Sequence, residues 1–506
     1  MLQIEFGEKM TQLIMALDQG TTSSRTIIFN EYGKIVAEAS VPLECKYPQS
    51  GWVEQDPEEI WNTQCRTIQT ALKRAQISMK DISAVGITNQ RESTIAWNRK
   101  TGEAISQAIN WQCRRTADFC EELKSEGFDS VLRNKTGLVT DPYFSGTKMR
   151  WILKNIPQAR DLAKRNELCF GTIDSWLIWK LTERRIHVTE ISNASRTLVY
   201  NINTCDWDDD ILSRFEIPRE TLPQVKPSSA VITEVNNELF GGEAPIAGVA
   251  GDQHAALFGQ ACFESGMSKN TYGTGCFMMS NTGSDLVFSK SGLLTTIAWK
   301  INEKVTYALE GSVFIGGALV QWLRDELQMF EDASDTQSIA ESVSDSGGVF
   351  IVPAFVGLGA PHWDPYARGT ILGLTRDSNR NHIVRASLEA IAFQSAEVLG
   401  SITKDVGIKM KELRIDGGAS ANDFLCQFQA DLLGLEVKRP EILETTALGA
   451  AFLAGLAVGV WRDKTQISLL WKEEKTFSPQ ISKKIADQKI EFWSRAVERS
   501  KGWEVH

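Results

Sequence analysis

The sequence lacks the cysteine spacing and the long apolar segments that would mark a secreted or a membrane protein. Its nine cysteines are odd in number and no two are spaced CxxC, which argues against a disulfide framework and against a zinc site. We therefore expect reduced thiols in a soluble, cytoplasmic protein. The first ten residues contain no apolar segment typical of a signal peptide. The longest mainly apolar stretch, residues 447–461, is shorter than the roughly 20 residues of a membrane span, so we predict a buried core helix there and no membrane insertion.

An excess of positive charge is also absent. The net charge is −10 and the isoelectric point is near 5.3, which argues against nucleic acid as a main partner because phosphate backbones are bound by basic surfaces. The contents of 42% hydrophobic and 23% charged residues are those of an ordinary globular protein. A length of 506 residues suggests two large domains or three small ones.

Several well-known catalytic motifs are missing from the chain. It contains no GxxxxGK[ST], which excludes a P-loop enzyme, and with no GxGxxG after an apolar strand and no HRD…DFG set, neither a Rossmann dehydrogenase nor a protein kinase is supported. It also contains neither HExxH nor GxSxG, the motifs of a zinc protease and of a serine hydrolase.

The first half of the chain predicts strands that alternate with helices. Residues 13–41 are typical of three strands joined by two polar turns, and residues 82–88 form a further apolar strand. A helix is predicted from Pro57, since Asp56 suits the N-cap and proline is favoured at the first helical position. One face of this helix would carry Ile60, Trp61, Cys65, Ile68 and Leu72. The alternation indicates an α/β fold with a largely internal sheet.

A second unit of similar pattern begins near Gly266. The segment NTYGTGCFMMSN repeats the strand, glycine-rich turn and strand of the opening LDQGTTSSRTIIFN, so we expect two copies of one supersecondary unit. Further helices are predicted at Ser312–Leu327 and His382–Gly400, and a strand at Leu413–Asp416. The boundary between the two halves would fall within residues 258–267.

The most suggestive polar segment of the first half is Asp18–Arg25, sequence DQGTTSSR, which follows an apolar strand. Backbone amides and hydroxyls in such a turn can bind phosphate oxygens, and an adjacent carboxylate can hold Mg²⁺ directly or through water. An arginine can offset charge that develops on a transferred phosphoryl group. An ordinary hairpin with a polar turn explains the segment equally well.

The matching segment of the second half is Asp416–Asn422, sequence DGGASAN. Paired glycines let a nucleotide approach the backbone closely, and the N-terminus of the helix that follows favours anions. A simple strand-to-helix turn is the alternative of equal weight.

Three further features suggest a polar ligand site, although each has a common structural explanation. Asp252 follows the apolar run PIAGVAG, where it could act as a general base, but solvated loop acids are more frequent. The adjacent Arg91 and Glu92 suit a ligand rich in hydroxyls, or form a surface ion pair. Trp111 and Phe277 could line a pocket, or could be two of many core aromatics.

Taken together, these segments resemble the FGGY carbohydrate kinases. Two long patterns carry the resemblance to the family, YFSGTKMRWILKN from Tyr143 and GTILGLTRDSNRNHIVRASLE from Gly369. Shorter segments are similar to the family members that phosphorylate glycerol: DQGTTSSR, GITNQRE, WQCRRT, NASRT, GDQHAALFGQ, NTYGTGCF, DGGASANDF and ETTALGAA. The resemblance extends over residues 13–460. It implies two actin-like (ribonuclease-H-like) ATPase domains with an active site in the cleft between them, at 12–258 and 267–460, followed by a helical extension at 461–506.

The resemblance also implies a role for each matching residue. Asp252 corresponds to the catalytic base, and the carboxylate of Asp18 to the group associated with Mg²⁺. The substrate contacts would be Arg91, Glu92, Tyr143, Asp252 and Gln253, with Trp111 and Phe277 beside them. The nucleotide contacts would be Thr21, Thr22, Ser23 and Arg25 in the first domain, and Thr274, Gly317, Gln321, Gly418 and Asn422 in the second.

The expected activity is the ATP-dependent phosphorylation of glycerol to sn-glycerol 3-phosphate, the first step of glycerol catabolism and a supply of glycerolipid precursor. The resemblance further suggests a homodimer or a homotetramer. Two alternatives stay open: a kinase of the same family for another polyol or a ketose such as xylulose, and a non-catalytic nucleotide-responsive protein on the same fold. The presence of Asp18, Arg91 and Asp252 together argues against the second alternative.

Overall fold

The computed structural model describes residues 12–407 and 410–504, which form two compact units. Unit 1 contains residues 12–259, Trp299–Lys304 and Thr446–Leu470, and unit 2 contains Gln260–Ala298, Val305–Thr445 and residues 471–504. The linear domain boundaries expected from the sequence stay a prediction. The expected absence of a signal peptide concerns residues that lie outside the described part of the chain.

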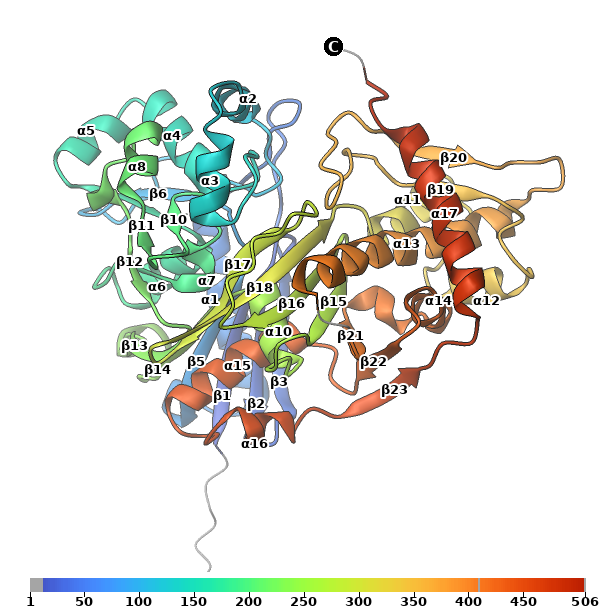
Figure 1. Ribbon diagram of the computed structural model, residues 1–506. Coiled ribbons are helices and arrows are strands. Elements are labelled where there is room, and N and C mark those ends of the chain that lie inside the picture. The colour runs from blue at the N-terminus through green and yellow to red at the C-terminus, as the bar shows by residue number, and fades with distance from the viewer. Residues whose placement is uncertain (1–11, 408–409, 505–506) are drawn as a thin grey trace, which may run out of the picture. The chain divides into compact units, whose positions relative to one another are not determined.

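Unit 1 is built on a sheet with the strand order β13-β14-β5-β1-β2-β3 (Figure 1). Its strands are β1 (Leu13–Gln19), β2 (Ser23–Asn30), β3 (Ile35–Pro42), β5 (Ile82–Asn89), β13 (Ser229–Glu234) and β14 (Pro245–Gly251). β1 and β14 both run parallel to β5, and β2 and β3 continue as an antiparallel hairpin series. Every residue of β1 is buried, as expected of a strand covered on both faces. The three strands predicted in residues 13–41 and the one in 82–88 are confirmed.

The parallel strands of unit 1 bring their carboxyl ends to one edge of the sheet. Gln19 of β1 and Gly251 of β14 both pair with Asn89 of β5. In open α/β sheets, ligands bind beyond this edge, because loops and helix starts gather there. The segments after β1, β5 and β14, which the sequence singled out separately, are therefore neighbours.

Helix α1 (Pro57–Ala75) begins as the sequence predicts. The Asp56 side chain accepts a hydrogen bond from the backbone N–H of Glu58 (2.9 Å), and Pro57 occupies the first helical position. The predicted apolar face is only partly correct, because Trp61 and Cys65 are half-buried. Its most buried side chains include polar ones that the apolar pattern missed, namely Thr63, Gln64 and Thr67. They hydrogen-bond to hydroxyls of β2, such as Ser24 and Thr26.

Helix α15 (Thr445–Ala457) confirms a buried core helix in the predicted segment 447–461, although the helix ends at Ala457. It packs directly on β5 and β14, and at the contact points there is no room for a side chain, so glycine is required. A Cβ atom at Gly86 would lie 2.3 Å from the carbonyl oxygen of Ala450, and one at Gly248 would lie 2.2 Å from the nitrogen of Ala454. The backbones of helix and strands can approach this closely only where side chains are absent.

A large part of unit 1 is inserted between β5 and β14. It contains short strands and helices that supply several site residues. Its elements are β6 (Ile95–Asn98), β7 (Ala108–Ile109), α2 (Ala117–Ser125), α3 (Asp129–Thr136), α4 (Ser145–Asn155), α5 (Ala159–Lys164), β8 (Leu168–Gly171), α6 (Ile173–Leu181), β9 (Val188–Glu190), α7 (Ile191–Ala194), β10 (Tyr200–Asn201), β11 (Asp206–Trp207), α8 (Asp209–Phe215), β12 (Gln224–Lys226) and α9 (Asn237–Phe240). Helix α10 (Asp252–Gly259) follows β14 directly.

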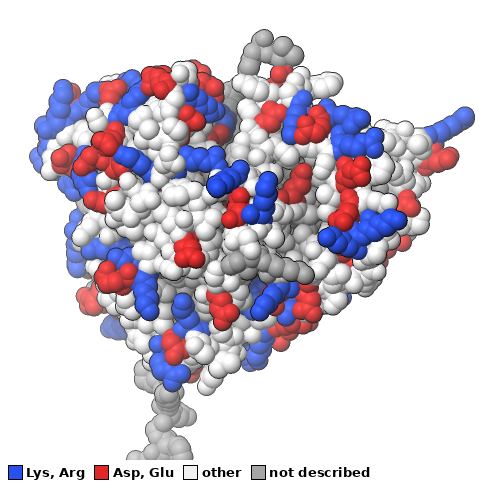
Figure 2. Space-filling model, viewed as in Figure 1, with Lys and Arg blue, Asp and Glu red and all other residues white. Residues whose placement is uncertain are grey.

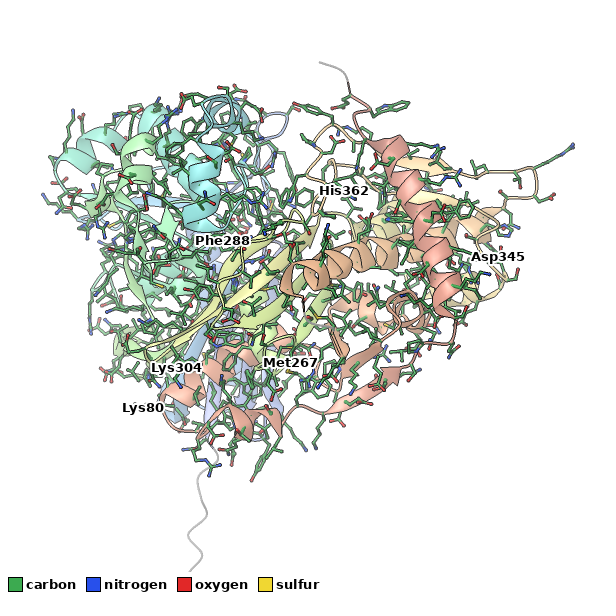
Figure 3. All side chains as sticks on the ribbon, in the orientation of Figure 1. Lys80, Met267, Phe288, Lys304, Asp345 and His362 are labelled. Carbon is green, nitrogen blue, oxygen red and sulfur yellow. The ribbon has the colours of Figure 1, made fainter. Side chains whose placement is uncertain are left out.

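Unit 2 repeats the strand arrangement of unit 1, which confirms the predicted duplication. β15 (Ser268–Tyr272) pairs antiparallel with β16 (Cys276–Gly283) and parallel with β21 (Glu412–Asp416), as β1 does with β2 and β5. Met267, labelled in Figure 3, immediately precedes β15. The other strands of this sheet are β17 (Leu294–Ile301), β18 (Lys304–Val313), β22 (Glu436–Pro440) and β23 (Glu473–Phe477).

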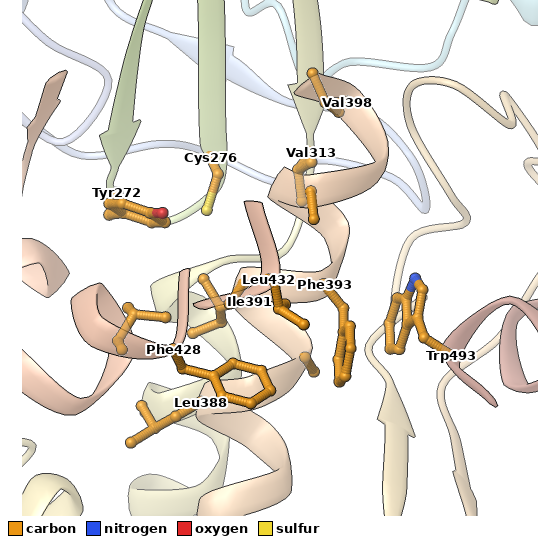
Figure 4. Close-up of a cluster of buried hydrophobic side chains, with 14 of the residues drawn as sticks. Tyr272, Cys276, Val313, Leu388, Ile391, Phe393, Val398, Phe428, Leu432 and Trp493 are labelled. Atoms are coloured by element: carbon orange, nitrogen blue, oxygen red, sulfur yellow. The ribbon is translucent and has the colours of Figure 1, made fainter. Parts of the chain in front are cut away.

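The helices of unit 2 pack around the long helix α13 (Arg380–Val406). They are α11 (Gly317–Asp325), α12 (Asp335–Glu341), α14 (Asp423–Leu433) and α17 (Lys483–Ser500). Phe393 of α13 stacks on Trp493 of α17, with ring centroids 5.2 Å apart, and Phe428 of α14 meets the same Phe393 ring edge-on (Figure 4). The charged C-terminal segment thus contributes a buried tryptophan to this core, and it contains β23 besides the expected helix.

One helix boundary predicted for unit 2 is wrong. The helix expected at Ser312–Leu327 begins only at Gly317, because Ser312 and Val313 end β18. Those two residues are buried and pair with Phe277 and Cys276 of β16. The predicted helix at His382–Gly400 exists but is longer, with Asn379 as its N-cap.

Basic and acidic side chains are interspersed on the face shown in Figure 2. Within residues 12–407 and 410–504, no helix is both long enough and apolar enough to cross a bilayer. All nine cysteines are free thiols.

Candidate active site

The turn after β1 is preceded by an acidic residue and followed by a basic one, and their side chains are in contact. Asp18 and Arg25 are register partners in the β1–β2 hairpin, and their side chains form an ion pair. The backbone N–H of Gly20 donates to the Ser23 carbonyl (2.9 Å), which closes a tight turn. Asp18 is buried, so its charge depends on nearby cations for compensation.

Buried amide side chains form hydrogen bonds that hold this turn in place. Gln55 donates to the carbonyl of Thr21 (2.7 Å), and its own oxygen accepts from Gln90 and Asn110 (both 2.9 Å). The indole N–H of Trp111 donates to the Thr21 hydroxyl (2.9 Å). The turn is therefore fixed in one conformation, as a preorganised phosphate site requires. Sequence reasoning missed Gln55 and Asn110, since no motif marks them; Gln90 lies inside the GITNQRE segment.

The chain makes a strained turn directly after β5. Glu92 has a φ of +62°, which is rare for a residue with a side chain, and the N–H of Ser93 donates to the carbonyl of Arg91 (2.7 Å). This hydrogen bond spans a three-residue γ-turn centred on Glu92. Strained conformations of this kind cluster at functional sites because the surrounding structure must hold them.

Arg91 and Asp252 meet across the edge formed by β5 and β14. Arg91 Nε lies 2.9 Å from Asp252 Oδ1; the arginine side chain is 2% exposed and the aspartate side chain 30% exposed. The carboxylate is thus the part of the pair that a substrate can reach. Gly251 makes room for the pair, because a Cβ there would lie 2.6 Å from two carbons of Arg91. Gln253, next to Asp252, is buried at the start of α10.

Glu92 is held by two fully buried cations. Its carboxylate pairs with Arg196 (2.6 Å), and its carbonyl accepts from Lys148 Nζ (3.0 Å) and Ser145 (3.0 Å). Lys148 also donates to the carbonyl of Tyr143 (2.6 Å). Burial lowers the pKa of Lys148 to about 7. Sequence reasoning assigned no role to Lys148 or Arg196, although YFSGTKMRW and NASRT contain them.

The aromatic residues of unit 1 connect the turn after β1 to the residues that follow β5. Trp111 lies edge-on to Tyr143, with ring centroids 5.6 Å apart. Because Trp111 also donates a hydrogen bond to Thr21, the turn after β1 and the residues around Glu92 form one continuous cluster. The structure thus brings together the expected residues of unit 1. Phe277 belongs to β16 of unit 2.

In unit 2, the loop after β15 packs against the start of α11. The N–H groups of Gly316 and Ala318 donate to the carbonyl of Thr274 (2.8 and 3.1 Å), and that of Gly317 donates to Gly273 (2.8 Å). A Cβ at Gly317 would lie 2.8 Å from that same Gly273 oxygen, so glycine is needed there. Gln321 lies one turn further along α11, on its exposed side.

The loop after β21 exposes its backbone at Gly418. No atom lies within 4 Å of the position that a Cβ would take at Gly418, whereas Gly417 has a φ of +86° and is enclosed by Tyr272. Asn422 caps α14 by accepting from the N–H of Leu425 (3.0 Å) and donates to Thr336 (3.1 Å). Thr271 and Asp416 are register partners, so the loops that contain Thr274 and Gly418 leave the same edge of the sheet.

The described residues contain no group of three or more histidine, cysteine, aspartate or glutamate side chains arranged to hold a metal. Asp18 is a single buried carboxylate at the turn after β1. A lone carboxylate is compatible with Mg²⁺, which takes one or two protein carboxylates together with phosphate and water ligands.

Comparison with known proteins assigns the family. The FGGY family of carbohydrate kinases matches with its N-terminal domain at residues 13–259 and its C-terminal domain at residues 268–458. Glycerol kinase 1 of Clostridium tetani is 57% identical over 98% of this chain and 99% of that protein. The crystal structure of Plasmodium falciparum glycerol kinase with ADP has a TM-score of 0.90 at 37% identity, covering 97% of this chain and 98% of that one. A xylulose kinase from Lactobacillus acidophilus has a TM-score of 0.86 at 24% identity over 96% and 98% of the two chains, which shows a common fold.

The chain belongs to the FGGY family of carbohydrate kinases. The resemblance inferred from its motifs is confirmed, and so is the fold: two mixed α/β domains of the actin-like ATPase type.

Proposed function

We propose that this chain transfers the γ-phosphoryl group of ATP to a terminal hydroxyl of glycerol, giving sn-glycerol 3-phosphate and ADP. Curated relatives at 56–57% identity over nearly the whole chain are glycerol kinases, which supports glycerol over other polyols. The structural observation that carries the proposal is the pair of Arg91 and Asp252, a buried cation beside a partly exposed carboxylate.

Asp252 acts as the general base that takes the proton of the attacking hydroxyl. Arg91 holds the carboxylate in place and, with Glu92, Tyr143 and Gln253, fixes the orientation of glycerol. Each glycerol hydroxyl both donates and accepts hydrogen bonds, so cationic and anionic partners around it define one pose. Trp111 and Phe277 contact the carbon side of the substrate.

The turn after β1 binds the phosphate groups of ATP. Backbone amides and hydroxyls of Thr21, Thr22 and Ser23 donate to phosphate oxygens, and Arg25 offsets charge on the transferred group. Phosphoryl transfer depends on positioning and charge neutralisation, which suits a turn fixed by Gln55 and its amide partners. Asp18 would hold Mg²⁺, which supplies further charge neutralisation on the phosphates when bound.

Residues of unit 2 bind the nucleoside part of ATP. The open backbone at Gly418 permits close approach of a nucleotide, and the N-terminus of α14 after Asn422 favours anionic groups. Thr274, Gly317 and Gln321 contribute from the glycine-rich loop after β15 and from the first turns of α11.

A cytoplasmic homodimer or homotetramer is the assembly that we propose. Nine free thiols support a reducing compartment. Light scattering after size-exclusion chromatography would give the molar mass in solution, and a monomer would contradict the proposed assembly.

The activity is tested by coupling ADP release to a spectrophotometric readout with Mg-ATP and glycerol, dihydroxyacetone, xylulose, ribulose or gluconate. We expect the highest kcat/KM with glycerol. A higher kcat/KM with a five-carbon sugar would replace glycerol by that substrate and would overturn the substrate roles of Arg91, Glu92, Tyr143 and Phe277. ADP release that no acceptor accelerates would contradict a kinase function.

A further inference from the structure

Residues 190–193 form a short buried segment that contacts both strands whose ends carry the proposed catalytic residues. Asn193 of α7 exchanges two amide hydrogen bonds with Asn89 at the end of β5 (3.0 and 3.1 Å). Ser192 accepts a hydrogen bond from the backbone N–H of Gly251 at the end of β14 (3.0 Å). One contact therefore lies two residues before Arg91, and the other lies one residue before Asp252.

Glu190 holds Ser192 in place. Ser192 donates its hydroxyl proton to one carboxylate oxygen of Glu190 (2.5 Å), and the N–H groups of Ser192 and Asn193 donate to the same oxygen (2.8 and 3.2 Å). The other oxygen accepts from the hydroxyl of Ser228, whose carbonyl binds the N–H of Val249 in β14. Glu190 and Ser192 are fully buried, so this network has no competing water and one preferred arrangement.

Gly251 needs such an external contact. The close approach of Arg91 excludes any side chain at position 251, so the backbone there has no side-chain packing of its own. Glycine also permits more backbone conformations than any other residue. Asp252 follows at once and starts α10, so the direction of its side chain depends on the backbone at Gly251.

We propose that Ser192, oriented by Glu190, is a positioning residue that fixes the carboxylate of Asp252 through the backbone of Gly251. This inference rests on the proposed role of Asp252 as the base. A misplacement of about 1 Å can cost roughly 100-fold in rate, so loss of the Ser192 hydroxyl lowers kcat while ATP binding is unaffected.

The test compares Ser192→Ala with Ser175→Ala by steady-state kinetics. Ser175 is also fully buried in unit 1, but its hydroxyl has no hydrogen-bond partner among the described residues, so its removal is a matched control. We expect kcat of Ser192→Ala to fall by about 10- to 100-fold with an unchanged KM for ATP, and kcat of Ser175→Ala to stay at the wild-type value. A wild-type kcat for Ser192→Ala would overturn the proposal. Should Ser192→Ala not fold, Ser192→Cys takes its place: its thiol is a weaker hydrogen-bond acceptor than the hydroxyl, so we expect a smaller fall in kcat with an unchanged KM for ATP, and a wild-type kcat would again overturn the proposal.

A double-mutant cycle with Asp252→Asn separates positioning from a general structural effect. If Ser192 acts through Asp252, Ser192→Ala has no further effect in the Asp252→Asn background. If Ser192→Ala lowers kcat by the same factor in the wild type and in Asp252→Asn, the inference is overturned and Asp252 stays the base. A near-normal rate for Asp252→Asn alone would instead contradict the proposed function of that residue.

Glu190 offers rescue by a conservative change. Glu190→Gln keeps an oxygen acceptor for Ser192 and a polar partner for Ser228, so it retains most of kcat. Glu190→Ala removes both contacts and lowers kcat as Ser192→Ala does. Equal kcat values for Glu190→Ala and the wild type would contradict the part assigned to Glu190.

Discussion

Arg91 Nε and Asp252 Oδ1 lie 2.9 Å apart, although the two residues are separated by 161 positions in the chain. β5 and β14 are paired in parallel, which brings the ends of both strands to one edge. The glycine before Asp252 then allows the arginine to approach. The proposed substrate site depends on this close packing of a charged pair.

Asp252→Asn should reduce kcat by about 10²- to 10⁴-fold, because the amide cannot accept the proton of the attacking hydroxyl. The change keeps the shape of the side chain and removes its charge. ADP affinity, measured by calorimetry, should stay at the wild-type value, which would show that the protein remains folded. A near-normal kcat would remove Asp252 from the role of base.

Gly251→Ala should displace Arg91, because the new methyl group would lie 2.6 Å from its side-chain carbons. We expect a loss of about 1–3 kcal/mol in the free energy of unfolding and a strong fall in kcat/KM for glycerol. Gly400→Ala is the matched control, since Gly400 lies exposed within α13 with open space around it. That change should stabilise the protein by about 1 kcal/mol and leave activity unchanged. Equal effects of the two substitutions on kcat/KM would contradict the prediction.

Gly418→Val should raise the KM for ATP and leave the KM for glycerol unchanged. The side chain would enter the open space at Gly418, where we propose that the nucleotide approaches the backbone. The melting temperature should change little, because no atom lies within 4 Å of the position that a Cβ would take at Gly418. Gly417→Ala should behave differently and destabilise the fold, since Gly417 has a φ of +86° and its Cβ would lie 2.6 Å from the Tyr272 carbonyl. An unchanged KM for ATP in Gly418→Val would place the nucleotide elsewhere.

Glu190 should make the stability of the protein depend on pH. Burial raises the pKa of its carboxyl from 4.5 to about 7, so the folded state binds a proton that the unfolded state has lost. The raised pKa contributes in full to the free energy of unfolding below pH 4.5, and this contribution is lost as the pH rises through about 7. It amounts to about 3 kcal/mol for one fully buried group. Urea unfolding at pH 5 and pH 8 measures the free energy of unfolding of the wild type and of Glu190→Gln. From pH 5 to pH 8, the wild type should lose stability relative to Glu190→Gln. A difference that is constant with pH would contradict the raised pKa.

Local signals predicted most strands and helix starts correctly. The buried run of β1, the cap and proline of α1 and the apolar helix α15 are each defined by residues close together in the sequence. The helix at Ser312–Leu327 failed for the same reason, because an apolar run after Gly311 suits either a strand or a helix. Its pairing with β16, which is decided by distant residues, made Ser312 and Val313 part of a strand.

Motifs identified the proposed site residues, but they did not identify the residues that hold those side chains in position. Gln55, Glu190 and Ser192 lie outside the motifs, and Lys148 lies inside YFSGTKMRWILKN, which by itself gives it no role. Their importance comes from burial and from hydrogen bonds to segments far away in the chain, such as that from Ser192 to Gly251.

The sequence alone determined the family, the α/β class and the duplicated hairpin, and it supplied the residues that we propose for the site, because each depends on short ordered segments. Only the tertiary structure decided that Arg91 is paired with Asp252, that Glu92 adopts a strained turn, and that Lys148 and Glu190 are buried with shifted pKa values. The physical reason is that burial, desolvation and close approach arise from neighbours in space, which a linear sequence does not specify.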